Sequence, residues 1–181
     1  MIKNATAGFT LVETLVSVVL LTMTIVLPYH AIQRSLSATF AARDDLIASS
    51  LAQEAIEYVR GVRDNNYLAG RPSTDWLYGL DGGVGEDNCV TANCTIDAIR
   101  EPVLVAVDQC TGACPGKELY LSNGTSLYTH QVTGAKTKYT RYIRLTPISG
   151  NPNAVRITVT VTWFSRTTHT VVLTDVITNW I

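Results

Sequence analysis

The sequence has little of what an enzyme active site or a metal site requires. Its three histidines are far apart and do not have the spacing of metal ligands: His30, His130 and His169. It contains no G-x-S-x-G nucleophile elbow, no P-loop and no H-E-x-x-H metalloprotease motif. We therefore expect a protein that is not an enzyme and that uses no cofactor and no bound metal.

Charge is also scarce, and neither sign is in excess. Charged residues make up 16% of the 181 residues, and the formal net charge is −1. Such a balance gives no general attraction to nucleic acid or to an anionic membrane surface. The length suits one compact domain with an appendage better than two large domains.

Hydrophobic residues are concentrated near the N-terminus. From Thr10 to Leu27 the one charged residue is Glu13, and the others are Leu, Val, Ile, Met, Thr and Ser. As a helix, this segment is about 27 Å long at about 1.5 Å per residue, close to the thickness of a bilayer's hydrocarbon core. We therefore predict a single membrane span. Lys3 precedes the span and Arg34 follows it, which places the N-terminus in the cytoplasm by the positive-inside rule.

The apolar segment lacks the cleavage site of an ordinary secretory signal. No small-residue A-x-A site follows Leu27, whereas the small residue Gly8 precedes the apolar run. The string GFTLVETLVSVVLL, residues 8–21, resembles the cleavage and methylation motif of the type IV pilin-like family. That motif has a short polar leader ending in Gly, then Phe, then a glutamate at the fifth mature position. Here these are residues 1–8, Phe9 and Glu13.

The resemblance implies a set of partners and a location. Prepilin peptidase would cleave between Gly8 and Phe9 and methylate the new amine of Phe9. The other expected partners are pilin or pseudopilin subunits and the inner-membrane assembly platform. The protein would span the bacterial inner membrane once, with its head outside the cytoplasm, and then join an extracellular or periplasmic filament.

Glu13 is the candidate functional carboxylate of this segment. A carboxylate within a spanning helix is costly unless it finds a partner. In a filament, that partner can be the cationic amine of Phe9 in a neighbouring subunit, and the pair would set the register of the subunits more than their net stability. The competing interpretation is that Glu13 is a tolerated polar residue near the membrane edge.

A second helical segment is expected after the span. Pro28 removes a backbone hydrogen bond and predicts a kink that need not end the helix. Beyond it, apolar residues recur at three- and four-residue steps, with Arg43 and Asp44 in the one gap: Ile32, Leu36, Phe40, Ile47, Leu51, Ala55, Tyr58 and Val62. This pattern predicts an amphipathic helix that covers a globular head and ends near residue 62 or 63, where Gly61 and the string RDNNY occur. A dimeric coiled coil is the competing use of the stripe.

The expected domains are a leader (1–8), a transmembrane or filament-core half-helix (9–28), an amphipathic half-helix (29–63) and a globular head (64–181). The head begins with a loop region (64–116) that contains all four cysteines: Cys89, Cys94, Cys110 and Cys114. An even number of cysteines outside the membrane favours disulfides, and the C-x4-C and C-x3-C spacings differ from the C-x2-C pairs of zinc knuckles. We hypothesise Cys89–Cys94 and Cys110–Cys114. The other two pairings stay open, including crossed bridging across a hairpin.

Two shorter strings of the loop region also lead to expectations. PVLVAV (102–107) is typical of a strand. The acidic string LDGGVGEDN (80–88) is expected to be a turn or an exposed loop, and its carboxylates Asp81, Glu86 and Asp87 make calcium binding the competing interpretation.

The remainder of the head (117–181) is expected to be a β-meander. Residues 138–147, 154–165 and 168–178 are rich in β-branched and aromatic residues and partly alternate. In the middle strand one face carries only apolar side chains: Val155, Ile157, Val159, Val161 and Trp163. The predicted class is α+β, with the long helix packed on a small antiparallel sheet. The pilin resemblance implies the same lollipop arrangement, and the pattern of these strands resembles the C-terminal regions of minor pilins and pseudopilins.

The leading functional hypothesis is a minor structural subunit of a type IV pilus or a related filament. The alternatives are a pseudopilin of a type II secretion system, a DNA-uptake or adhesion subunit whose head binds a ligand, and a single-pass anchored protein that keeps its leader. Basic and aromatic residues that can contact DNA alternate in one strand: Lys136, Lys138, Tyr139, Arg141, Tyr142 and Arg144. The competing interpretation is a solvated strand edge whose charges prevent edge-to-edge pairing.

Overall fold

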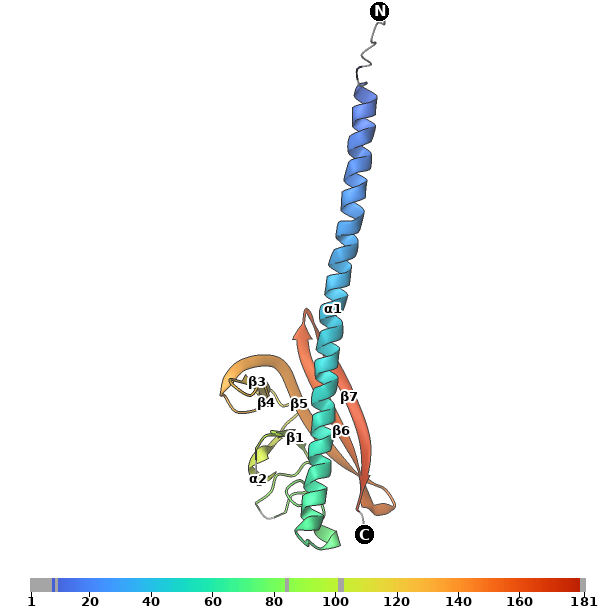
Figure 1. The fold of residues 1–181 in the computed structure, drawn as a ribbon. Coiled ribbons are helices and arrows are strands. Elements are labelled where there is room, and N and C mark those ends of the chain that lie inside the picture. Colours follow the sequence, from blue (N-terminus) through green and yellow to red (C-terminus); the bar gives the residue numbers. More distant parts are fainter. Residues whose placement is uncertain (1–7, 9, 84, 101–102, 180–181) are drawn as a thin grey trace, which may run out of the picture. The chain divides into compact units, whose positions relative to one another are not determined.

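The computed structural model describes residue 8 and residues 10–83, 85–100 and 103–179. A long helix precedes a mainly antiparallel β-structure (Figure 1). The elements in chain order are α1 (Leu11–Leu68), the 3-10 helix η1 (Ser73–Asp75), β1 (Asn93–Ile96), α2 (Val103–Ala106), β2 (Val107–Cys110), β3 (Glu118–Ser122), β4 (Tyr128–Thr129), β5 (Gly134–Ile148), β6 (Asn151–Ser165) and β7 (Thr167–Thr178). The predicted α+β class, with a long N-terminal helix and an antiparallel sheet, is confirmed. The chain divides into two compact units, Met1–Asp44 and Asp45–Ile181.

The N-terminal unit is helical from Leu11 onward. Helix α1 continues through Pro28, as predicted, although residue 28 has no N–H to donate to the carbonyl of Thr24. The apolar residues that begin the predicted stripe, Ile32, Leu36 and Phe40, are exposed. That part of the stripe is therefore not buried within its own unit.

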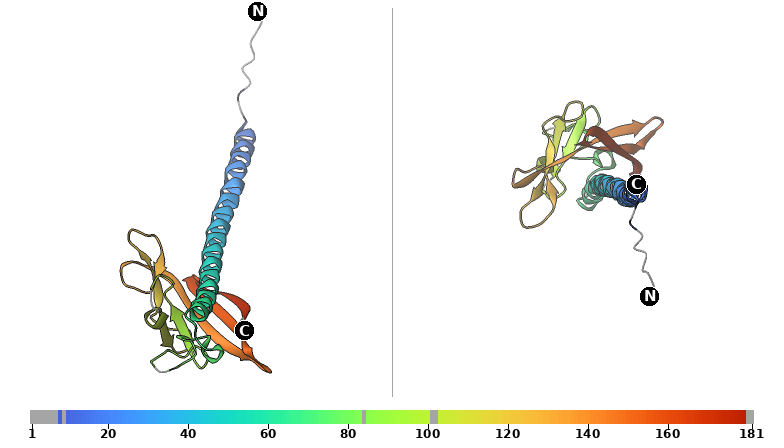
Figure 2. Two further views of the ribbon diagram at one scale, coloured as in Figure 1. Left: turned by 60° about the horizontal axis from the view of Figure 1, so that its bottom comes forward. Right: turned by 90° about the horizontal axis from the view of Figure 1, so that it is seen from above.

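In the C-terminal unit, α1 buries one face against the sheet (Figures 1 and 2). The buried positions follow the three- and four-residue steps of a helix: Ala48, Leu51, Ala52, Ala55, Ile56, Val59, Val62 and Asn66. Three of them are alanines, which fill little space between the helix and the sheet. The amphipathic packing helix is thus confirmed, with its contact face starting at Ala48 rather than at Ile32.

Helix α1 ends at Leu68, beyond the predicted end near residue 62 or 63. Gly61, taken as a stop signal, lies within the helix. The true stop is Gly70, which has a left-handed φ of 70°. There the Arg71 N–H donates to the carbonyl of Asn66 (3.2 Å) and the Gly70 N–H to that of Tyr67 (2.9 Å). These two bonds form a Schellman cap, in which a glycine is favoured because it has no Cβ.

The sheet has the order β2-β1-β5-β3-β4, and β6 pairs with β5 and β7. All of its pairings are antiparallel. The predicted three-strand meander is confirmed as β5-β6-β7, with each strand beginning up to four residues earlier than expected. The five apolar side chains of the middle strand are buried, and on its other face Arg156 is exposed.

Two expectations about this unit are wrong. Within PVLVAV, residues 103–106 form the short helix α2, and strand β2 begins only at Val107. A short apolar run does not distinguish a buried helical turn from a strand. From Tyr139 onward the strand with the basic residues is not an edge, because β5 pairs there with β6 on one side and with β1 and β3 on the other.

Candidate functional site

The predicted processing junction lies immediately before α1. Gly8 is exposed and has no regular secondary structure, and Phe9 and the preceding leader residues lie outside the described residues. Helix α1 starts two residues after Phe9, at Leu11. Thr10 caps it, because its Oγ1 accepts a hydrogen bond from the N–H of Glu13 at 3.3 Å.

Glu13 is exposed in the first turn of α1, at the third helical position. The pair Thr10 and Glu13 has the T-x-x-E spacing of a capping box, a signal that the sequence analysis missed. An anion in the first turn also interacts favourably with the positive end of the helix dipole. The carboxylate therefore has a capping role available in addition to any role in subunit register.

The surface around Glu13 is apolar and exposed. Between Leu11 and Leu27 the large hydrophobic side chains are 42–80% exposed. The hydroxyl groups of this segment are bonded within the helix: Thr14 donates to the Leu11 carbonyl (2.8 Å), Ser17 to that of Glu13 (2.7 Å), Thr22 to that of Val19 (2.8 Å) and Thr24 to that of Leu21 (2.8 Å). Such local pairing makes hydroxyl groups compatible with an apolar environment. Near its N-terminus, α1 is long and apolar enough to span a membrane.

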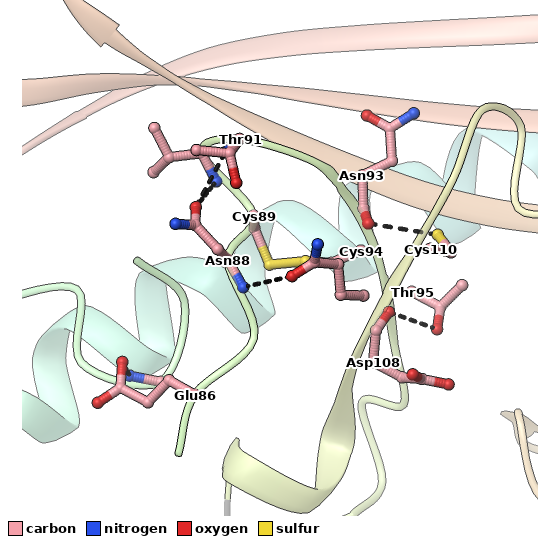
Figure 3. The surroundings of a disulfide bond; sticks show 12 residues. Glu86, Asn88, Cys89, Thr91, Asn93, Cys94, Thr95, Asp108 and Cys110 are labelled. Atoms are coloured by element: carbon pink, nitrogen blue, oxygen red, sulfur yellow. Dashed lines mark hydrogen bonds between the residues drawn. A yellow bond between two sulfur atoms is a disulfide. The ribbon is translucent and has the colours of Figure 1, made fainter. Parts of the chain in front are cut away.

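The cysteine pairs agree with our hypothesis. Cys89 bonds to Cys94 and Cys110 to Cys114, with Cα–Cα distances of 5.4 and 5.2 Å. β1 and β2 do form a hairpin, but neither bond crosses it. Figure 3 shows the first pair at the turn that leads into β1.

The turn at Cys89 is anchored to the core. The side-chain oxygen of Asn88 accepts hydrogen bonds from the N–H groups of Val90 (3.0 Å) and Thr91 (2.9 Å), as Figure 3 shows for Thr91. The carbonyl of Cys89 accepts a bond from the N–H of Leu145 in β5 at 2.9 Å. The backbone hydrogen bond thus holds this turn on β5, and the disulfide joins the turn to β1.

The acidic string forms a turn, as expected: the Glu86 N–H donates to the carbonyl of Gly83 (3.1 Å), and Gly82, Gly83 and Gly85 are exposed. One carboxylate oxygen of Glu86 accepts hydrogen bonds from the N–H groups of Gly79 (2.8 Å) and Gly83 (3.2 Å). Burial, followed by a hydrogen bond and repulsion from Glu86, raises the pKa of Asp81 to about 6. Within the described residues, no three His, Cys, Asp or Glu side chains gather as metal ligands would.

The basic and aromatic residues of β5 do not form one surface. The side chain of Arg141 is 0% exposed, forms an ion pair with Glu54, and donates to the carbonyls of Leu51 (3.0 Å) and Ile96 (2.8 Å). Tyr139 is buried on the same face as Arg141. Tyr142 and Arg144 lie on the opposite face of the strand and are half-buried. Lys136 and Lys138 are exposed and precede Tyr139, where the pairing of β5 with β6 begins, so the solvated strand edge is confined to this end of β5.

The most distinctive candidate site is therefore the exposed N-terminal part of α1 with Gly8 and Glu13. Comparison with protein-family models, with curated proteins and with solved structures found no match to this chain.

Proposed function

We propose that this protein is a structural, minor subunit of a type IV pilus or a related filament such as that of type II secretion. The observation that carries the proposal is the Gly8–Phe9 junction directly before an apolar helix with one carboxylate, Glu13, in its first turn. The proposal includes the lollipop arrangement of pilins, in which a long N-terminal helix carries a globular head. Prepilin peptidase, neighbouring subunits and the inner-membrane assembly platform are its partners.

The exposed part of α1 is suited both to the membrane, before assembly, and to the core of a filament, after assembly. Its apolar side chains have no partners among the described residues of the N-terminal unit, so they need either lipid or other helices around them. Its hydroxyl groups already satisfy themselves within the helix. The same surface can therefore move from a bilayer into a filament core without exposing unsatisfied polar groups.

Glu13 can set the axial register between neighbouring helices in the filament. After cleavage, the amine of Phe9 would lie at the start of the helix, four residues before this carboxylate. A carboxylate that meets the amine of an adjacent subunit fixes the axial offset between the two helices, and an incorrect offset leaves a charge unpaired in an apolar environment. The charge thus selects one register.

The disulfides support a C-terminal unit outside the cytoplasm. Two bonds hold the loop region, and both persist in oxidising compartments but are rare in the reducing cytosol. A single span with a cytoplasmic N-terminus delivers the C-terminal unit to such a compartment.

The first test is the intact mass and N-terminal peptide of the chain after co-expression with a prepilin peptidase. We expect loss of residues 1–8 and a methylated Phe9. A Gly8→Val variant should remain uncut because the bulky side chain disturbs the junction, and a catalytically inactive peptidase is the matching control. A chain that still starts at Met1 beside an active peptidase would overturn the proposal.

A second test separates the charge of Glu13 from its capping role. Glu13→Gln keeps the length and hydrogen-bonding capacity of a capping-box residue but removes the charge. We expect Glu13→Gln and Glu13→Ala both to be cleaved and both to be lost from sheared filaments, as judged by immunoblot. Ser17→Ala, one turn later, is the control and should be incorporated normally. Normal incorporation of Glu13→Gln would reduce Glu13 to a helix cap.

A further inference from the structure

The turn between β3 and β4 contains the one Asn-Gly pair of the chain, Asn123 and Gly124. The two strands lie at one end of the sheet order, where β4 pairs with β3 (Figure 1). Two backbone hydrogen bonds hold the base of the turn: the Ser122 N–H donates to the carbonyl of Leu127 (2.9 Å), and the Ser126 N–H donates to that of Ser122 (3.3 Å). The Asn-Gly pair lies at the tip, between the residues that these bonds join.

The two groups at the tip are accessible and can react with each other. Asn123 and Gly124 are both exposed. Within the described part of the chain, neither the side-chain amide of Asn123 nor the N–H of Gly124 makes a hydrogen bond. Gly124 has a φ of 107°, and a Cβ added there would meet nothing within 4 Å. No neighbouring group among the described residues therefore shields the backbone nitrogen of Gly124.

The other asparagines of the chain do not offer this combination, since none of them precedes a glycine. After Asn88, the N–H of Cys89 is engaged, because it donates to the carbonyl of Leu80 at 2.9 Å. Asn151 precedes Pro152, which has no N–H at all. The fold thus distinguishes the exposed Asn-Gly pair from asparagines whose following nitrogen is bonded or lacks a proton.

We propose that Asn123 is a site of spontaneous deamidation and isomerisation. The backbone nitrogen of Gly124 loses its proton and attacks the side-chain carbonyl carbon (Cγ) of Asn123. A new C–N bond forms, and the side-chain nitrogen leaves as ammonia, taking up a proton to replace the one released. The product is a five-membered succinimide ring. Glycine favours this step, because it has no Cβ to obstruct the approach of its nitrogen.

Water then opens the ring at one of its two carbonyl carbons. Opening at Cγ restores the original main chain with an aspartate side chain. Opening at the main-chain carbonyl carbon leaves the peptide link on Cγ, which gives isoaspartate and a main chain that is one methylene longer. No oxidant or reductant takes part. Either product carries one carboxylate, so the formal net charge becomes one unit more negative than −1.

The reaction changes the tip of the turn and spares its base. The hydrogen bonds that join Ser122 to Leu127 and Ser126 involve backbone groups outside the Asn-Gly pair. Exposed loops also open at little cost in free energy, so the fold does not hold the pair away from the geometry of the ring. The chain should therefore acquire a carboxylate on this turn as it ages. The inference does not rest on the proposed function, because the unprocessed chain contains the same turn.

The test is incubation of the full chain in detergent at pH 8 and 37 °C, followed by tryptic digestion and mass spectrometry. Asn123 lies in the tryptic peptide 118–136, in which Gln131 is the one other side-chain amide. We expect this peptide to gain, with time, the mass difference between a hydroxyl and an amino group, and to separate chromatographically into aspartate and isoaspartate forms. A sample digested at time zero corrects for deamidation during digestion.

A synthetic peptide of residues 121–127 gives the reference rate for an unfolded chain. Because the turn leaves the reacting groups free, the rate in the folded chain should lie within about a hundredfold of the rate in the peptide. Asn123→Gln is the matched control: it keeps the amide but requires a six-membered ring, which forms more slowly, so its tryptic peptide should keep its mass over the same time. Asn123→Asp marks the elution position of the aspartate form.

Three results would overturn the proposal. A rate in the folded chain that is lower by more than about a hundredfold would show that the fold protects the pair. Aspartate without isoaspartate would indicate direct hydrolysis of the amide instead of a succinimide. An equal mass gain in Asn123→Gln would place the modification at another residue of the peptide.

Discussion

Arg141 shows at the scale of one residue how the C-terminal unit joins its parts. Its guanidinium connects β5 to the carbonyl of Leu51 in α1 and to that of Ile96 in β1, and it pairs with Glu54. The sequence contains a signal for this burial, because Arg141 alternates with the apolar residues Tyr139 and Ile143 on one face of the strand. Because arginine is charged, the sequence analysis expected Arg141 to be exposed instead.

Removing the guanidinium should cost more than removing its carboxylate partner. Arg141→Met leaves two backbone carbonyls without their donor, and we expect a loss of about 3 kcal/mol in the free energy of unfolding. Glu54 is 35% exposed, so Glu54→Gln should cost only about 1 kcal/mol because solvent reaches the site. Urea denaturation followed by the fluorescence of buried Trp163 measures both. Equal losses would show that the ion pair, and not the carbonyl contacts, dominates.

Asp81 should make stability depend on pH. Its pKa rises from 3.8 to about 6 in the folded chain, mainly through burial and then through Glu86. A raised carboxyl pKa means that the folded state favours the protonated form, so the stabilisation is fully present below pH 3.8 and is lost as the pH rises through 6. Asp81→Asn imitates the protonated form. It should raise the melting temperature at pH 7.5 and change it little at pH 4.

Thermal scans of the parent and of Asp81→Asn at both pH values provide that comparison. Asp87→Asn, in the same loop, is the control for a general loss of negative charge. A rise of the same size at pH 4 and at pH 7.5 would contradict the titration of Asp81.

At the scale of elements, the two glycines near the end of α1 have opposite roles. Gly61 lies within the helix, and a Cβ added there would meet nothing within 4 Å. Gly70 has a φ of 70° and ends the helix. Gly61→Ala should therefore stabilise the chain by about 1 kcal/mol through helix propensity, and Gly70→Ala should destabilise it by about 1 kcal/mol through the left-handed backbone. Chemical denaturation of the pair, side by side, tests the assignment, and a loss of stability in Gly61→Ala would contradict it.

Elements with a long and regular pattern were predictable from the sequence. The strands β5, β6 and β7 alternate over many residues, and each was placed within four residues of its observed start. PVLVAV was misjudged because four apolar residues in a row fit a helical turn as well as a strand. The end of α1 was misplaced because a glycine within a helix and a glycine that ends one look alike until the following hydrogen bonds are known.

A cavity of about 310 Å³, lined by Asp97, Lys117 and His130 among others, could not be predicted for a different reason. Asp97, Lys117 and His130 are separated by long stretches of sequence, and only the pairing of β1, β3 and β4 around β5 brings their segments together. By contrast, the Gly8 and Glu13 signal is contained in six consecutive residues. Local signals can be found in the sequence, but a site assembled from several strands requires the fold.

At the scale of the whole molecule, the two units should differ in their need for detergent. The buried face of α1 starts at Ala48, and large apolar side chains are exposed on the helix before it. A chain that starts at Asp45 should therefore remain folded and soluble without detergent, whereas the full chain should aggregate when detergent is removed. Size-exclusion chromatography combined with circular dichroism distinguishes the two behaviours. Aggregation of the shortened chain would show that residues 1–44 are needed to cover the C-terminal unit.

The position of β5 and β6 inside the sheet has a consequence for the slowest motions of the chain. Each has a paired neighbour on both sides, and their mutual register runs from Tyr139 opposite Trp163 to Pro147 opposite Val155. The amides that join β5 to β6 can exchange with deuterium only when these two central strands separate from each other, which approaches global opening. β7 pairs with β6 alone within the described chain, so its outward amides can open locally. Protection from isotope exchange should therefore last longest at the pairing between β5 and β6, which the rest of the sheet flanks.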